Sequence, residues 1–143
     1  MPTPGSHPSA HVPIEVDWVG GLEFEAGRAE RPKVRIDGDA KIAPSPFDML
    51  LASIATCSAI DVVTILQKQR TPVHALHIRV EAYRVEATPR RLASAVLHFS
   101  VTAPGTTAQK VARAVELAVT KYCSVRSSLI ADAPVTWTIE LKP

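Results

Sequence analysis

Two cysteines are the side chains best suited to chemistry in this sequence. Cys57 lies in the middle of a long apolar stretch, and Cys123 lies at the end of a second helical pattern. A cysteine reacts as its thiolate, which forms readily where a nearby cation or a helix N-terminus lowers the pKa of the thiol. Cys57 is far from the ends of its own predicted helix, so a cation would have to come from elsewhere in the fold. Without that cation, Cys57 is interpreted as a small buried hydrophobic side chain.

The sequence lacks the patterns of metal and nucleotide sites. It contains no CxxC motif, and His74 and His77 are three residues apart at the start of a strand pattern, which places them on opposite faces. No GxGxxG or GxxxxGK[ST] motif is present to hold phosphate, and no GxSxG elbow marks a nucleophilic serine. Ser53 and Ser58 are therefore interpreted as packing residues, and no metal or cofactor is expected.

Composition argues against several classes of function. The 16 Lys and Arg residues against 14 Asp and Glu residues give a net charge of +2, so a nucleic-acid-binding surface is not expected. The apolar stretch 47–66 contains two aspartates and several Ser and Thr residues, which argues against a membrane span. Residues 1–13 contain no apolar signal segment, which predicts a cytoplasmic protein.

The stretch 45–70 predicts one long helix. Ser45 is a suitable N-cap, Pro46 suits the first helical position, and Asp48 completes a capping box with Ser45. Apolar and small residues follow on every side, so we expect this helix to be buried nearly all round. At about 1.5 Å per residue it spans roughly 37 Å, as much as the diameter of a compact chain of this length. A symmetric homodimer would cover the part that so short a chain leaves exposed.

The elements around this helix predict an α+β fold with a mainly antiparallel sheet. Alternating apolar residues predict six strands. They lie near residues 11–19, 22–26, 34–36, 76–82, 95–101 and 135–141. Thr106 or Thr107 is expected to cap an amphipathic helix that Cys123 closes, and Ser124 to cap a further short helix. Residues 1–10 are expected to be a disordered lead-in, and residues 11–143 a single domain.

The motifs around the cysteines resemble those of the OsmC/Ohr family of osmotically inducible and organic-hydroperoxide-resistance proteins. The first motif is Ser45-Pro46-x-Asp48-x-Leu50-Leu51 followed by Ala55-Thr56-Cys57-x-Ala59-x-Asp61-Val62, and the second is Lys121-Tyr122-Cys123-Ser124-Val125. Asp17-Trp18, Gly20-Gly21-Leu22 and Ile36-Asp37-Gly38 are similar to the N-terminal sheet of the OsmC-like branch. The resemblance covers roughly residues 12–141, in the order of elements that the family has.

This resemblance implies an intertwined homodimer whose two long helices are enclosed by sheets from both chains. It also implies a thiol peroxidase that reduces organic hydroperoxides in oxidative-stress defence. In that reading Cys57 attacks the peroxide and becomes a sulfenic acid, and Cys123 resolves it as an intramolecular disulfide. A dithiol reductant, lipoyl-type or other, restores both thiols. No metal or flavin is implied.

The sequence departs from the hydroperoxide-resistance branch at the positions that would activate the thiol. Phe47 follows Pro46 where that branch has Glu, and the acid is Asp48, one position and about 100° of helix rotation later. Asp48 is therefore either a catalytic acid or a helix cap alone. Arg28 is the first choice for the activating arginine, with Arg31 and Arg35 as alternatives.

Two further points stay open at this level. Asp61 is one helical turn after Cys57, and its charge would disfavour the thiolate unless a cation intervenes. If no arginine reaches Cys57, peroxidase activity should be weak. The alternative function is then a non-catalytic or weakly active stress-associated protein with the same fold, which binds a ligand or acts as a redox switch.

Overall fold

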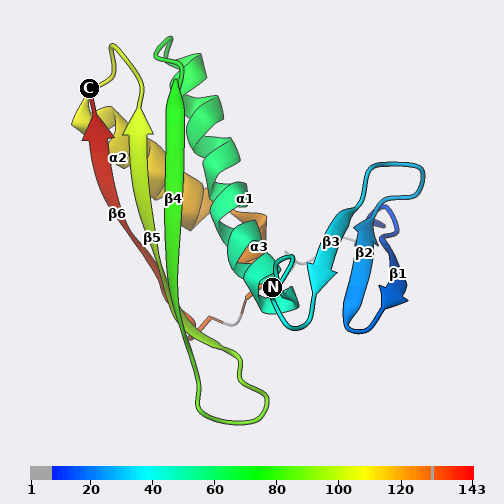
Figure 1. Ribbon diagram of the computed structural model, residues 1–143. Coiled ribbons are helices and arrows are strands. Elements are labelled where there is room, and N and C mark those ends of the chain that lie inside the picture. The colour runs from blue at the N-terminus through cyan, green and yellow to red at the C-terminus, as the bar shows by residue number, and fades with distance from the viewer. Residues whose placement is uncertain (1–7, 130) are drawn as a thin grey trace. The chain divides into compact units, whose positions relative to one another are not determined.

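The computed structural model describes residues 8–129 and 131–143 (Figure 1). These residues divide into two compact units, with the boundary between Met49 and Leu50. We call them the N-terminal unit and the C-terminal unit. Helix α1 (Pro46–Lys68) begins in the first and continues through the second. Residues 1–7 of the predicted lead-in lie outside the described part of the chain, and the single domain over 11–143 stays a prediction.

The N-terminal unit is built on a three-stranded antiparallel sheet. Its strands β1 (Glu15–Gly20), β2 (Glu23–Gly27) and β3 (Val34–Asp37) pair in the order β1-β2-β3. The predicted turn after β1 is confirmed, and Gly20 and Gly21 adopt φ values of 124° and 52° that favour glycine. The first strand begins at Glu15 rather than His11, because Pro13 has no N–H to donate to a ladder.

The two faces of this sheet differ in character. One face carries two rows of apolar side chains, Val16–Ala26–Val34 and Trp18–Phe24–Ile36. The opposite face carries the row Asp17–Glu25–Arg35. On the apolar face Val16 and Trp18 are 62% and 68% exposed. The single chain therefore leaves much of the apolar face uncovered.

Asp37 organises the loop that leads from the sheet to α1. Its carboxylate accepts backbone N–H groups of Asp39, Lys41 and Ile42 at 3.0, 3.0 and 3.1 Å. The N–H groups of Asp39 and Ile42 do most to hold the pKa of Asp37 below its ordinary value, against the opposing effect of burial. The carboxylate of Asp37 thus stabilises the loop by accepting its backbone N–H groups.

The predicted capping box begins α1. Asp48 N donates to Ser45 Oγ at 3.1 Å, and Ser45 N donates back to Asp48 Oδ2 at 2.9 Å. At the other end Arg70 adopts a left-handed φ of 61° and donates its N–H to the Gln67 carbonyl at 3.0 Å, which closes the helix. The helix therefore has the start and the end that the sequence predicts.

The C-terminal unit joins α1 to a second three-stranded sheet and three further helical segments (Figure 1). Strands β4 (Ala75–Arg84), β5 (Leu92–Thr102) and β6 (Val135–Lys142) pair in that order, β4 with β5 antiparallel and β5 with β6 parallel. Alternate residues of β5 are buried, as the period-2 pattern predicts. The α+β class with mainly antiparallel sheets is confirmed.

A helical run follows β5 and leads to the second cysteine. It consists of α2 (Ala108–Leu117), with Thr107 as its N-cap, then one π-helical turn, η1 (Ala118–Tyr122), and, beyond Cys123, the short helix α3 (Ser124–Ser127). Val111, Ala114 and Val115 are the buried residues of α2. This run carries Cys123 into the core of the C-terminal unit.

Burial of α1 is confirmed along one stripe. Side chains four residues apart are fully buried: Ile54, Ser58, Val62 and Leu66. Another strip of the helix lines an apolar hollow of about 340 Å³: Thr56, Ala59, Ile60, Val63 and Thr64. Ile60 is 66% exposed there, so the single chain does not bury the helix all round. By length and composition α1 is also able to cross a membrane, but that is weak support for a span because the core helices of globular proteins meet the same criteria.

Candidate functional site

The structure brings the two predicted thiols together. Cys57 lies near the middle of α1 and is half-buried, whereas Cys123 follows η1 and is 3% exposed. Both are free thiols, and each influences the pKa of the other. The Cys123 thiol also points to the Ile54 carbonyl of α1 at 3.9 Å. Two residues 66 positions apart in the chain therefore form one cluster.

Cys123 is the N-cap of α3. Its backbone is extended, with φ −71° and ψ 99°, and its Sγ accepts the N–H of Arg126 at 3.3 Å. The prediction that Ser124 caps this helix is wrong by one residue. A serine oxygen is the usual cap. Here the Cys123 sulfur contacts the Ile54 carbonyl of α1 and accepts the free N–H of Arg126 in its place. Ser124 becomes the first residue of the helix, and its hydroxyl is left for another partner.

That partner is Cys57. Ser124 Oγ lies 3.9 Å from Cys57 Sγ, and the backbone N–H groups of Ser124 and Val125 also lower the pKa of this thiol. Burial opposes the charged form and is the largest single influence on the pKa of Cys57. The hydrogen bonds from Val125, Cys123 and Ser124 together outweigh burial and place the pKa of Cys57 below its ordinary value.

Cys123 has the opposite character. Burial is again the largest influence and raises the pKa of the Cys123 thiol. The N–H of Arg126 and the hydroxyl of Ser58 oppose this rise, but the neighbouring Cys57 adds to it. The cluster therefore contains one thiol that ionises more easily than usual and one that ionises less easily.

The groups that lower the pKa of Cys57 are polar groups on α3 and the second thiol, which sequence reasoning did not find. It required a cation, because α1 alone offers Cys57 no help. The available signal was Ser124-Val125 directly after Cys123, where a helix start was predicted. Among residues 8–129 and 131–143, no group of three or more His, Cys, Asp and Glu side chains could hold a metal.

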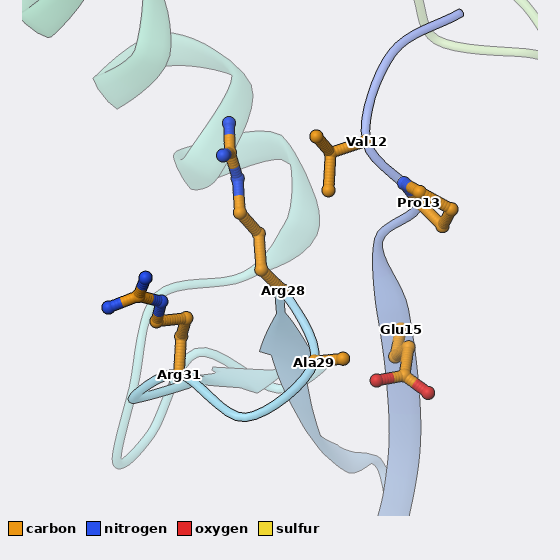
Figure 2. Close-up of a pocket in the computed structure, with 6 residues that line it drawn as sticks. All are labelled: Val12, Pro13, Glu15, Arg28, Ala29 and Arg31. Carbon is orange, nitrogen blue, oxygen red and sulfur yellow. The ribbon is translucent and has the colours of Figure 1, made fainter.

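Two of the three predicted arginines, Arg28 and Arg31, lie on the loop between β2 and β3, and Arg35 lies in β3. Figure 2 shows Arg28 and Arg31 on this loop, beside a hollow of about 440 Å³ that Val12, Pro13 and Glu15 also line. Neither arginine forms an ion pair with a residue that the structure describes. Two glutamates, by contrast, hold both Nη atoms of Arg35 at 2.9 Å. Of the three candidates, Arg28 and Arg31 thus keep an unpaired guanidinium.

Asp48 is exposed, and its carboxylate is engaged in the capping box. Nine residues, about two and a half turns, separate it from Cys57 along α1, which turns the two side chains to opposite sides of the helix. Asp48 therefore has a demonstrated structural role. The catalytic roles of Asp48 and Arg28 stay predictions.

Comparison with known proteins places this site in a family. The family model described as OsmC-like protein matches residues 37–140, which includes both cysteines. The chain belongs to the OsmC-like family. It is 40% identical over 127 residues to Protein YhfA of Escherichia coli strain K12, covering 88% of this chain and 95% of that protein.

Solved structures of OsmC and Ohr proteins share the fold. The OsmC-like protein of Mycoplasma pneumoniae superposes with a TM-score of 0.78 at 15% identity, covering 94% of this chain and 99% of that one. The organic hydroperoxide resistance protein OhrB of Bacillus subtilis superposes with a TM-score of 0.58 at 14% identity, covering 93% and 98%. At these identities the likeness establishes the OsmC fold for this chain, and the resemblance seen in the sequence is confirmed.

Proposed function

We propose that this OsmC-like protein is a thiol peroxidase that reduces organic hydroperoxides, with Cys57 as the attacking thiol and Cys123 as the resolving thiol. The observation that carries the proposal is the pair itself. The two free thiols lie on segments in contact, because Cys123 Sγ is 3.9 Å from the Ile54 carbonyl of α1 and Ser124 Oγ is 3.9 Å from Cys57 Sγ. Their surroundings move their pKa values in opposite directions. A peroxidase of this kind needs one thiol ionised for attack and a second thiol within reach. The names of fold neighbours such as OhrB support the choice of substrate class.

The first step is attack of the Cys57 thiolate on the outer oxygen of a hydroperoxide, R–O–O–H. An S–O bond forms while the O–O bond breaks, so Cys57 becomes a sulfenic acid and R–O⁻ leaves. The alkoxide takes a proton from water and departs as the alcohol. Two electrons have moved from the sulfur to the peroxide.

The second step is resolution by Cys123. Its sulfur attacks the sulfenic sulfur, an S–S bond forms, and the Cys123 proton leaves with the hydroxyl group as water. An external dithiol, lipoyl-type or other, then exchanges with the disulfide and returns both cysteines to thiols. The reductant supplies two electrons and two protons and is itself oxidised to a disulfide.

Arg28 and Asp48 are the proposed helpers of this chemistry. Arg28 is supported by its place beside the hollow of the N-terminal unit and by the lack of an ion pair with any residue among 8–129 and 131–143. Asp48 is the weaker of the two, because its carboxylate already serves the helix start. The protein is proposed to act in the cytoplasm.

A homodimer is proposed as the working form. Two apolar surfaces support it: the exposed strip of α1 around Ile60, and the apolar face of the β1-β2-β3 sheet around Trp18. Large exposed apolar surfaces commonly mark association sites, and symmetric dimers are the commonest assemblies. Sedimentation of the full chain tests this part, and a stable monomer at micromolar concentration would contradict it.

The peroxidase proposal is tested by following consumption of cumene hydroperoxide with dihydrolipoamide or dithiothreitol in excess. The parent chain should turn over repeatedly. Cys57→Ser should abolish turnover, and Cys123→Ser should allow one oxidation per chain and then stall. Unchanged turnover in Cys57→Ser would contradict the proposal. A parent chain that forms its disulfide once, without repeated turnover, would support the redox-switch alternative instead.

A further inference from the structure

The hydroxyl of Ser124 has no established role. As the first residue of α3 it is not the helix cap, because the Cys123 sulfur holds that position. Its Oγ lies 3.9 Å from Cys57 Sγ and has no other hydrogen bond within the described part of the chain. The Ser128 hydroxyl bonds to the backbone carbonyl of Ser124 and leaves the side chain untouched.

We propose that Ser124 is a positioning residue that holds Cys57 as a thiolate by donating its hydroxyl hydrogen to Cys57 Sγ. The inference rests on the proposed function. It assigns to Ser124 a stabilisation of the Cys57 thiolate that the sequence led us to expect from an arginine. In the neutral pair either atom can be the donor. Once the thiol has lost its proton, only Ser124 can donate, so the bond favours the charged sulfur.

The geometry leaves room for this bond to strengthen. A separation of 3.9 Å is long for a hydrogen bond to sulfur, and bonds to charged acceptors are shorter and stronger than bonds between neutral groups. Ser124 is exposed, but Cys57 is half-buried, so water reaches the sulfur less freely than it reaches the hydroxyl. The gain is therefore largest in the ionised state.

Other hydroxyls near Cys57 on its own helix are already committed. Thr56 donates to the Ala52 carbonyl at 2.8 Å, and Ser58 donates to the Ile54 carbonyl at 3.0 Å. Both follow the usual habit of helix serines and threonines, which bond the carbonyl one turn back. Ser124 comes from a different element and so has its hydroxyl free for the sulfur.

The test is the pH dependence of Cys57 alkylation by iodoacetamide in the reduced full chain, with no peroxide present. Trypsin releases Cys57 in peptide 42–68 and Cys123 in peptide 122–126, so mass spectrometry follows each thiol separately. Ser124→Ala should slow Cys57 alkylation about three- to tenfold below the midpoint of the profile, the loss expected for one hydrogen bond of ordinary strength. The midpoint should move to higher pH, and the rates should converge at high pH, where both proteins carry the thiolate.

The other ionisable groups of this region stay in place in every variant. On the elements around Cys57 they are Asp48, Asp61 and Lys68 on α1, Lys121 and Tyr122 on η1, Cys123, and Arg126 on α3. Their contribution is common to parent and variant, so a displaced midpoint reports the hydroxyl. Ser127→Ala removes an exposed hydroxyl from the same short helix and should leave the profile unchanged.

Matched variants keep the inference testable even if the alanine variant folds poorly. Ser124→Thr keeps the hydroxyl. Ser124→Val introduces a side chain of nearly the same shape as threonine but without a hydroxyl. The threonine variant should retain the parent midpoint, and the valine variant should move it upward. Superimposable profiles for parent, alanine and valine variants would overturn the inference. A loss of rate that is equal at all pH values would also overturn it, because it would indicate a merely structural role.

This experiment separates the inference from the peroxidase proposal. Alkylation measures the thiolate alone, so the Ser124 effect stands or falls without any peroxide reaction. If the midpoint moves as expected but cumene hydroperoxide is not consumed, the peroxidase proposal fails and the role of Ser124 survives. If turnover is normal and the midpoint does not move, the opposite holds.

Discussion

The two halves of the thiol cluster differ in what surrounds the sulfur. Cys57 is half-buried and receives hydrogen bonds from Ser124 and Val125 on α3. Cys123 is 3% exposed, and its sulfur caps α3 and contacts the Ile54 carbonyl. Burial raises the pKa of both thiols, but only around Cys57 do hydrogen bonds outweigh it. The balance between donor groups and burial therefore sets which of the two thiols ionises more easily.

The same short segment serves both cysteines. Cys123 begins α3 and thereby directs the first residues of that helix at Cys57. In the proposed cycle, the resolving cysteine therefore also helps to prepare the attacking one. A change at Cys123 has to be interpreted with this second role in mind.

The largest expected effect is the reactivity gap between the two thiols. At neutral pH Cys57 should be alkylated at least about tenfold faster than Cys123, because its thiolate fraction is larger and it is more exposed. The gap should narrow as the pH rises and Cys123 also ionises. Peptide-resolved alkylation of the reduced full chain measures both rates, with Cys57→Ser as the control for peptide assignment. Equal alkylation rates of Cys57 and Cys123 at neutral pH would contradict the claim that Cys57 ionises more easily.

The Arg28→Ala variant tests whether a cation stabilises the Cys57 thiolate in addition to the hydrogen-bond donors on α3. If Arg28 stabilises the thiolate, this variant should slow Cys57 alkylation about threefold or more below the midpoint and leave Cys123 unchanged. Arg35→Ala is the matched control, because Glu23 and Glu25 already hold the Arg35 guanidinium. No difference between the Arg28 and Arg35 variants would leave the α3 donors and the Cys123 thiol as the groups that activate Cys57.

Asp48→Asn belongs to the same series and separates the two roles of that residue. As a cap, Asp48 should affect thermal stability, and its loss should lower the melting temperature by a few degrees with the alkylation profile unchanged. As a catalytic acid, it should lower peroxide turnover at an unchanged melting temperature. Circular dichroism and the cumene hydroperoxide assay distinguish these results.

Local patterns made much of this arrangement predictable. The capping box at Ser45 and Asp48, the glycine turn after β1 and the alternating residues of β5 each depend on neighbours in the sequence. That the two cysteines belong to one site was implied by the family resemblance and not by any local pattern. What the sequence could not show was the hydrogen bonding around Cys57, because residue 124 reaches residue 57 only through the packing of α3 against α1.

The cap of α3 is the instructive error. Propensity favours serine over cysteine as an N-cap, so Ser124 was the natural choice. The tertiary contact of the Cys123 sulfur with the Ile54 carbonyl overrides that preference and moves the helix start by one residue. One residue decides whether the Ser124 hydroxyl caps a helix or faces a thiol. The requirement for a cation was likewise drawn from α1 alone, before donors from another element were visible.

Asp61→Asn should produce the smallest effect. The Asp61 carboxylate lies one helical turn after Cys57, and its charge opposes the thiolate that the α3 donors favour. Removing that charge should raise Cys57 alkylation about twofold below the midpoint, the size expected for two partly solvated charges one turn apart. The increase should vanish in 1 M salt, where charges are screened within about 3 Å. Asp132→Asn, which removes a charge from the loop beyond α3, is the control for net charge. A decrease in rate for Asp61→Asn would instead make Asp61 a partner of an activating cation, and would return the search for that cation to Arg28 and Arg31.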